Sequence, residues 1–380
     1  MRPAVALGAL ALVPAITAGA AEGVSGSLAL HAGTLAPHAR TPAPHAGTLA
    51  PHAKAQARPA RSPAVTLQWV GDIALSARLG LPPGGLVRAL APVARTLRSA
   101  QITAGNLEGT LSSDGVSKCG GADSATCFAF QAPGSLAGQL RALGFRLVNQ
   151  ANNHSMDYGA GGRSQTLTAL RRAGVAYTGL PGQISLVRVG GERVAFLGFA
   201  PYSYDGNLLD IPSAQRLIRR AARLAPIVVV IIHAGAEGAD RLHTPYGPEF
   251  FLGEDRGDAR AFAHAAIDAG ASVVLGSGPH VIRGVERYRG HLIAYSLGNF
   301  VGYHTLAGGG VLDDSGILRV TLGPRGRLLA ARWISVKLEG GLPRLDPADS
   351  AARLAAALSR SDFPRDHFTI GPSGLFHLRS

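Results

Sequence analysis

The sequence predicts an α/β protein whose sheets contain both parallel and antiparallel strands. Two observations carry this prediction. Between residues 64 and 278, apolar runs of strand length alternate with helix-like segments, a pattern typical of layered α/β folds. Within 184–200, and again beyond residue 290, short apolar segments follow one another with only turns between them, which indicates antiparallel strands and mixed sheets.

Each element follows from a local pattern. Strands are predicted where apolar residues run together and end in a polar turn, at 64–72, 101–109, 145–154, 175–179, 184–200, 226–235, 271–278, 291–300, 316–324 and 328–338. Helices are predicted where apolar residues recur with a period near 3.6, at 84–100, 133–144, 161–174, 213–225, 258–270 and 346–360. Pro133 and Gly144 bound one of these helices in the way that helix ends favour.

The N-terminal 63 residues differ in composition from the rest of the chain. Residues 1–21 combine Arg2, an apolar run and small residues, as a cleavable secretory signal does. A permanent membrane anchor is the alternative, but the run is short and Pro14 interrupts it. In residues 22–63, His recurs every seven residues with Pro in each unit, which predicts a disordered Ala/Pro/His linker; weak metal binding by these histidines is the alternative. The folded domain is therefore predicted to span 64–380.

The chain is basic, with a formal net charge of +13. Residues 1–63 contain five basic residues and one acid, so the remainder carries +9. A basic body suits an anionic substrate, an anionic cell-surface polymer or lipid head groups. Nucleic acid is not expected as a partner, because no basic run interleaved with aromatic residues occurs.

The two cysteines, Cys119 and Cys127, flank a short Gly-rich segment. Together with a secretory signal, this spacing favours a disulfide bond, and two cysteines alone are too few for a zinc site. The disulfide and the signal both predict an exported protein, extracellular or associated with the cell envelope.

Polar side chains repeatedly follow the predicted strands. Each has an ordinary structural interpretation, such as a helix cap, a solvated loop, a core histidine or, in the segment NNH, an asparagine turn. Because the carboxyl ends of strands in layered α/β folds meet at one crevice, their joint occurrence favours a metal or polar catalytic site instead. The residues are Asp72, Asn106, Glu108, Asn153, His154, His233, Glu237 and His280.

A series of motifs then carries a resemblance. GDI, NLEGTLS, ANNHSMDYG, IIHAGAEG, GPHVIRGVERY and IAYSLGNF occur in this order, and over about residues 64–340 they resemble the CapA family of capsule or poly-γ-glutamate biosynthesis proteins. That family is related to calcineurin-like metallophosphoesterases. The resemblance implies a four-layer α/β/β/α sandwich of two mixed sheets, with a metal-type site in the loops between them.

The resemblance also implies roles for individual residues. Those expected to hold a divalent metal ion, with Mn or Mg favoured, are Asp72, Glu108, Asn153, His233 and His280. Expected catalytic residues are His154, as an acid or charge-stabilising group, and Glu237, which could replace a missing ligand. Residues expected to contact the substrate include Asn106, Tyr295 and Asn299, the last two with a strand-end turn as the alternative. The basic charge of the domain adds Arg283 and Arg287, on either side of GVE beside His280, as candidate contacts for an anionic substrate, with a solvated strand edge as the alternative.

Two positions depart from the phosphoesterase pattern. Ala74 and Gly278 stand where those relatives usually carry histidines, so each side of a two-metal centre lacks one imidazole. Two hypotheses follow. The protein is a metal-dependent hydrolase that cleaves a phosphoester or an amide of an anionic polymer, or it is a non-catalytic assembly protein of the cell envelope that binds a polyanion in the same crevice.

Overall fold

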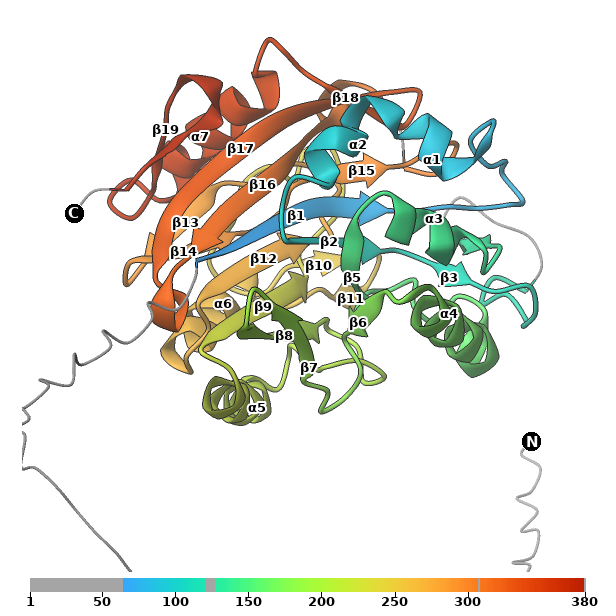
Figure 1. The fold of residues 1–380 in the computed structure, drawn as a ribbon, viewed down its shortest axis with the longest axis horizontal. Coiled ribbons are helices and arrows are strands. Elements are labelled where there is room, and N and C mark those ends of the chain that lie inside the picture. The colour runs from blue at the N-terminus through green and yellow to red at the C-terminus, as the bar shows by residue number, and fades with distance from the viewer. Residues whose placement is uncertain (1–63, 121–126, 307, 379–380) are drawn as a thin grey trace, which may run out of the picture. The chain divides into compact units, whose positions relative to one another are not determined.

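Two mixed β-sheets packed face to face form the centre of the domain (Figure 1). The computed structural model describes residues 64–120, 127–306 and 308–378. The eight-stranded first sheet has the order β18-β17-β16-β1-β2-β5-β6, with β15 alongside β1. The six-stranded second sheet has the order β13-β14-β12-β9-β8-β7. The predicted α/β class with mixed sheets is confirmed.

The strands of the first sheet are β1 (Val65–Ile73), β2 (Ile102–Leu107), β5 (Phe145–Asn149), β6 (Ala176–Thr178), β15 (Asn299–Val301), β16 (Asp314–Leu322), β17 (Leu328–Glu339) and β18 (Leu342–Leu345). Those of the second sheet are β7 (Ser185–Val189), β8 (Glu192–Phe199), β9 (Ile227–His233), β12 (Val273–Ser277), β13 (Val285–Tyr288) and β14 (His291–Ala294). Short pairs are β3 (Thr110–Leu111) with β4 (Gln131–Ala132), β10 (Phe250–Phe251) with β11 (Glu254–Asp255), and β19 (Thr369–Ile370) with β20 (Phe376–His377).

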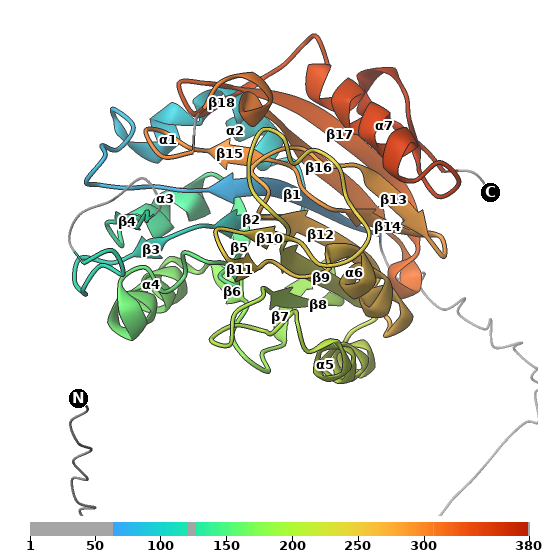
Figure 2. The same ribbon diagram turned by 180° about the vertical axis from the view of Figure 1, so that it is seen from behind.

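Helices cover the outer faces of both sheets (Figures 1 and 2). The first sheet packs against α1 (Gly85–Ala89), α2 (Ala91–Leu97), α3 (Leu136–Ala142) and α4 (Gly159–Ala173), and the second against α5 (Ile211–Leu224) and α6 (Ala259–Asp268). A third core lies between the sheets and includes residues of α7 (Ser350–Asp362). Three cores separate four layers, which confirms the α/β/β/α sandwich.

Strand β9 shows why these segments form central strands. Its residues are apolar almost throughout, as expected of a parallel strand covered on both faces. Val229 and Ile231 point into the core between the sheets, whereas Val228, Val230 and Ile232 point into the core under the helices. The strand ends at His233, at its carboxyl end. The same two-residue alternation directs the His233 side chain toward the first sheet, as it does Val229 and Ile231.

A register shift in β1 sets the direction of Asp72. Leu67 and Trp69 face the second sheet, and Val70 faces the helices. The pairing of β1 with β2 is irregular between Trp69 and Asp72, so that Ile73 shares the helical side with Val70. A bulge of this kind re-aims side chains. Asp72 consequently points toward the second sheet.

The two sheets are also joined directly beside this bulge. The indole Nε1 of Trp69 donates a hydrogen bond to the carbonyl oxygen of Gly276 in β12, at 3.0 Å. The backbone N–H of Asp72 donates to the carbonyl oxygen of Gly298, at 3.1 Å. The backbone at Gly71 passes so close to Gly298 that a Cβ atom would lie 1.7 Å from its oxygen. Close backbone contact therefore fixes the position of Asp72.

Two predicted segments differ in the structure. The helix expected at 84–100 is divided at Leu90, because Pro92 lacks the N–H that would continue it. The strand expected at 291–300 is two strands that belong to different sheets: β14 runs parallel to β12, and β15 runs parallel to β1. Between them Gly298 adopts a positive φ of 70°, which lets the chain cross from one sheet to the other.

Cys119 and Cys127 form a disulfide bond, as predicted. The predicted signal at 1–21 and linker at 22–63 lie outside the described residues. Within the described part of the chain, no helix has the length and apolar character needed to cross a bilayer.

The Gly71→Ala substitution should lower the free energy of unfolding by about 3 kcal/mol, because the new methyl group overlaps the Gly298 carbonyl. Urea denaturation measures this change. Gly161→Ala is the matched control: it lies within α4 with open space around its Cβ position, so it should stabilise the protein by roughly 0.5–1 kcal/mol. Equal stability of the two variants would contradict the close approach at Gly71.

Replacing both cysteines by serine should lower the free energy of unfolding by about 2–3 kcal/mol, because the unfolded chain regains the entropy of a short loop. The comparison is with the parent protein, under oxidising and reducing conditions. Reduction should destabilise the parent by a similar amount and leave the variant unchanged. A parent protein that is indifferent to reductant would argue against a stabilising role.

Candidate metal centre

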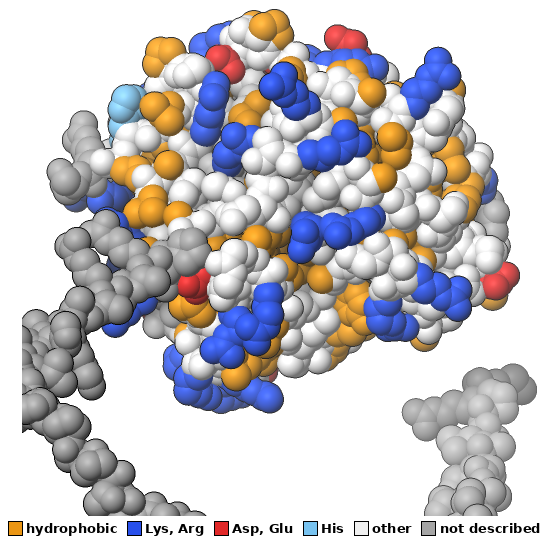
Figure 3. Space-filling view, in the orientation of Figure 1, with side chains coloured by type: hydrophobic (Ala, Val, Ile, Leu, Met, Phe, Trp, Pro, Cys, Tyr) orange, Lys and Arg blue, Asp and Glu red, His pale blue; other side chains and the backbone are white. Residues whose placement is uncertain are grey.

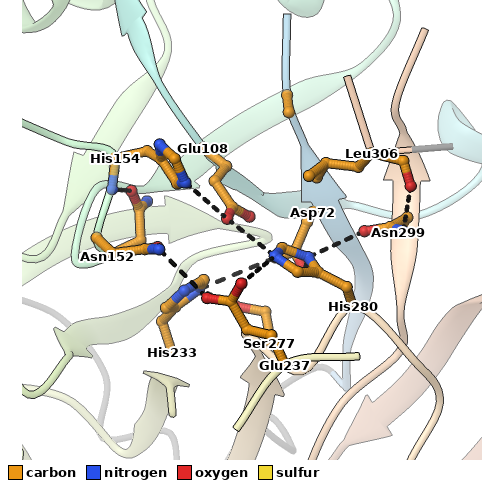
Figure 4. A network of polar contacts seen from close by, with 12 residues as sticks. Asp72, Glu108, Asn152, His154, His233, Glu237, Ser277, His280, Asn299 and Leu306 are labelled. Atoms are coloured by element: carbon orange, nitrogen blue, oxygen red, sulfur yellow. Dashed lines mark hydrogen bonds and ion pairs between the residues drawn. The ribbon is translucent and has the colours of Figure 1, made fainter. Parts of the chain in front are cut away.

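Polar side chains from five strand ends converge at one edge of the two sheets (Figure 4). Asp72 comes from β1, Asn106 and Glu108 from the end of β2, and His154 from the loop after β5. The second sheet supplies His233 at the end of β9 and, after β12, His280. The structure thus brings together the residues that the strand-end pattern singled out.

At the centre, Asp72, Glu108 and His233 form a cluster suited to a metal ion. One potential ligand atom from each lies within 4.8 Å of the others, and all three side chains are buried. Glu108 Oε1 and His233 Nε2 are buried without a hydrogen-bond partner in the described part of the protein. Buried polar atoms normally have hydrogen-bond partners. Two potential metal-ligand atoms without such partners in one cluster therefore indicate a place for a cation.

Asn106 connects the members of this cluster. Its side-chain amide nitrogen donates to Asp72 Oδ1 at 2.8 Å and to Glu108 Oε2 at 3.2 Å. Its oxygen accepts hydrogen bonds from Asn149 and Asn152, each at 3.0 Å. Asn106 is fully buried, so it orients the carboxylates instead of facing a substrate.

His280 lies on the other side of Asp72. Its Nδ1 is 3.1 Å from Asp72 Oδ2 and 3.0 Å from Asn299 Oδ1. Its Nε2 is 3.5 Å from both Glu108 Oε1 and Glu237 Oε2. The backbone of His280 has a φ of +62°, an uncommon conformation for a non-glycine residue that turns the ring toward the carboxylates. Asn299 is buried, and its role here is to hold His280.

His154 is held by a partner that the sequence analysis did not single out. Its Nδ1 lies 2.8 Å from Asp157 Oδ2, and its ring packs against Phe130 with centroids 4.5 Å apart. Asp157 also accepts from the Phe130 backbone and forms an ion pair with Lys118 at 2.7 Å. The other ring nitrogen, Nε2, faces Glu108 Oε1 at 3.9 Å. The His-x-x-Asp spacing in the sequence is the signal that could have identified Asp157.

Asn153 and Glu237 meet at the mouth of the cluster. Asn153 Nδ2 donates to Glu237 Oε1 at 3.3 Å, while its Oδ1 is buried without a partner in the described residues. Glu237 also pairs with the buried Arg256, which the sequence did not indicate because the two residues belong to different loops. Asn153 Oδ1 is thus a further oxygen that could contact a cation.

The two central carboxylates differ in their acidity. Burial would raise the pKa of Asp72, but the hydrogen bond to His280 and the charge of His280 hold that pKa below its ordinary value. Burial, reinforced by the negative charge of Asp72, raises the pKa of Glu108 well above its ordinary value. A cation placed between them would relieve this repulsion.

The pKa values of the three histidines also differ, because burial and neighbouring charges act on each of them to a different extent. Burial lowers the pKa of His233 to about 3, so its imidazole is neutral and able to act as a ligand. Burial also lowers the pKa of His154, although Asp157 opposes this effect. For His280, the surrounding carboxylates outweigh burial and raise its pKa well above the ordinary value. The carboxylates around His280 therefore favour its protonated form as long as no cation lies among them.

The cluster opens into a cleft of about 1020 Å³. Its walls are largely aromatic and include Phe128, Phe251 and the stacked pair Tyr202 and Tyr204, whose ring centroids are 5.3 Å apart. Its cationic residues, Lys118 and Arg256, are paired with Asp157 and Glu237. A substrate reaching the cluster would pass through this cleft.

Two of the expected substrate contacts lie elsewhere. Arg283 is buried, and its guanidinium donates to both carboxylate oxygens of Glu249 and to backbone carbonyls, so it fixes a loop and does not line the cleft. Tyr295 is buried in the core beneath the helices, where its hydroxyl donates to Glu286 Oε2 at 2.5 Å. Neither side chain faces the metal cluster.

The donor set fits a divalent ion. It offers two carboxylates, one neutral imidazole and an amide oxygen, from Asp72, Glu108, His233 and Asn153. Oxygen-rich sets of this kind suit magnesium or manganese, and imidazole also suits manganese and zinc.

Comparisons with known proteins place these residues in a family. The model of the bacterial capsule synthesis protein family PGA_cap matches residues 66–304, which include every residue of the cluster. The PGA biosynthesis protein CapA of Bacillus subtilis (strain 168) is 34% identical over 179 residues, covering 43% of this chain and 44% of that protein. The capsule biosynthesis protein CapA of Bacillus anthracis is 33% identical over 184 residues, covering 43% and 41%. The match thus spans less than half the length of these relatives.

Solved structures align with the chain at low sequence identity. A 5'-nucleotidase precursor from Thermus thermophilus aligns with a TM-score of 0.43 and 18% identity, covering 78% of this chain and 59% of that one. Purple acid phosphatase PPD1 from yellow lupin aligns with a TM-score of 0.37 and 10% identity, covering 75% and 53%. The family match covers more than half of the chain and the whole cluster. This chain belongs to the bacterial capsule synthesis protein family PGA_cap.

Proposed function

We propose that this protein is an exported, metal-dependent hydrolase that acts on capsule, poly-γ-glutamate or another anionic polymer of the cell envelope. The observation that carries the proposal is the buried cluster of Asp72, Glu108 and His233, with its orphaned donor atoms, beside the His154–Asp157 pair and open to a cleft. The bond to be cleaved is a phosphoester or an amide. Export is supported by the disulfide and by the signal-like composition of residues 1–21.

The residues of the cluster would have separate roles in the reaction. Asp72, Glu108, His233 and the oxygen of Asn153 would hold a divalent ion, with manganese or magnesium favoured. Such an ion, when bound, lowers the pKa of water and stabilises negative charge that develops in the transition state. His280, expected as a ligand from the sequence, contacts Asp72 through Nδ1 and turns Nε2 toward Glu108 and Glu237, so its imidazole would complete the ligand set when an ion is bound.

His154 is placed to handle a proton. Asp157 fixes its Nδ1, and the packing of its ring against Phe130 restricts its orientation, so that Nε2 is directed toward the cluster and the cleft. From this position His154 can protonate a leaving group or stabilise its charge, which is the role of a general acid. Glu237, held by Arg256, closes the site beside Asn153.

A second candidate function has its own support. At Gly278, a Cβ atom would lie 2.9 Å from the backbone nitrogen of Ala234, and φ is +117°, so the backbone leaves no room for the imidazole that phosphoesterases usually carry there. Ala74 likewise offers no ligand. A depleted ligand set favours a non-catalytic protein that binds a polyanion and helps to assemble the polymer.

The decisive experiment assays the purified, metal-loaded protein against phosphoester and γ-glutamyl amide substrates. Turnover that requires manganese or magnesium supports the hydrolase. Polymer binding without turnover of either bond, in protein that retains its metal, supports the assembly protein instead.

Glu108→Gln should weaken metal binding at least about tenfold, because the cluster loses one of its two negative charges and an orphaned oxygen. Isothermal titration of the apo-protein with manganese measures the affinity. Glu192→Gln, in the hairpin at the opposite end of the second sheet, removes the same charge and should not change the affinity. If both variants bind manganese as well as the parent, Glu108 is not a ligand.

His154→Ala should leave manganese affinity within about twofold of the parent and lower turnover on the order of 100-fold. The metal ligands remain in place, whereas the proton donor is gone. His243→Ala removes a surface histidine with an exposed side chain and should keep full activity. Full turnover of His154→Ala would remove this residue from the mechanism and leave the ion to act without it.

A further inference from the structure

A second cavity lies far from the cluster, at the edge where β13, β14, β19 and β20 meet. It has a volume of about 500 Å³. Its lining includes Arg287 and Arg289 from the β13–β14 hairpin, Arg365 and His367 from the segment after α7, and His377 from β20. Residues close together in this cavity are thus drawn from three separate parts of the sequence.

The register of the second sheet places this cavity at the opposite end from the metal cluster. β14 runs parallel to β12, pairing Leu292 with Val273, and β12 leads at its carboxyl end to the cluster. The β13–β14 turn, where Tyr288 pairs with His291, therefore lies at the end where β12 begins. Figures 1 and 2 agree that β13, β14 and α7 lie at the same end of the domain, and Figure 1 shows β19 beside α7.

The lining of the cavity is strongly cationic. It contains three arginines and two histidines but a single acid, Asp366. Arg289 is partly compensated by Asp268, at 3.2 Å from its Nε. Arg365 and His377 make no side-chain hydrogen bond or ion pair with any other residue in the described part of the chain. The side chains of Arg365 and His377 are therefore available to a ligand in this concave site.

The cationic side chains of the cleft at the metal cluster are arranged differently. There, Lys118 and Arg256 are both neutralised by buried carboxylates. On the face shown in Figure 3, Lys and Arg side chains are scattered over the surface and gather over α5, and Asp and Glu are sparse. The basic cavity differs from both, because three arginines line the same concave volume.

We propose that this cavity is a binding site for a ligand carrying two or more oxyanion groups, either phosphates or carboxylates. A guanidinium presents its donors in a planar fork that matches both groups. The volume falls within the range of small-molecule sites and exceeds the space that one phosphate needs, so a short chain of anionic groups fits better than a single ion. The site is independent of the metal cluster and of the activity proposed there.

The test titrates the full chain, at low salt, with tripolyphosphate and separately with a short γ-linked glutamate oligomer. Arg365→Ala should weaken the binding of whichever probe binds by about tenfold. Arg223→Ala, exposed on α5, removes the same charge elsewhere and should leave the affinity unchanged. Glu108→Gln should also leave it unchanged, which separates this site from the metal centre.

Each outcome of these titrations either supports or overturns the proposed anion site. Binding of tripolyphosphate alone identifies a phosphate site, and binding of the glutamate oligomer alone identifies a carboxylate site; both support the proposal if Arg365→Ala weakens them. Absence of binding by either probe overturns it. Equal weakening by Arg365→Ala and Arg223→Ala also overturns it, because the attraction would then come from the general charge of the protein. Arg365 is exposed, so circular dichroism should show both variants folded.

Discussion

Two carboxylates, Asp72 and Glu108, are buried between the sheets, and the surrounding residues must compensate their charges. A buried charge is tolerated only when partners compensate it. Asn106 donates to both, the cationic His280 lies against both, and His233 approaches from the second sheet. These partners come from different strands and from both sheets. The loops at this edge are therefore held together by electrostatic compensation as well as by the apolar core between the sheets.

The compensation is incomplete in a way that favours metal chemistry. Burial and the charge of Asp72 both disfavour the ionised form of Glu108 and raise its pKa, and one of its oxygens has no hydrogen-bond partner in the described residues. His233 is neutral and likewise keeps one nitrogen unpaired. A purely structural network would satisfy these atoms, whereas a ligand set leaves them for a cation. The neutral, aromatic character of the adjoining cleft also implies that the cluster, not the cleft walls, supplies the charge that acts on a substrate.

Much of this arrangement could be predicted from the sequence, because polar residues at strand ends meet in any layered α/β fold. The four layers and the residues gathered around Asp72 followed from strand-end pattern and resemblance. The direction in which individual side chains point could not be predicted in the same way. Tyr295 continues the alternation of β14 and shares the outer face with Ile293, which only the finished sheet reveals. The prediction of Arg283 as a substrate contact is wrong because its partner, Glu249, lies in a loop whose path the sequence does not show.

The bulge in β1 has a consequence for how this family could diversify. Trp69 and Asp72 both face the second sheet because one extra residue interrupts the alternation between them. If the strand continued past Trp69 in regular alternation with the same number of residues, the aspartate would turn toward the helical layer. A substitution at Gly71 that removed the bulge could thus take the acid out of the cluster in a single evolutionary step and leave the apolar residues of all three cores unchanged. In distant relatives, the residue at the bulge should be as informative about chemistry as the identity of the acid itself.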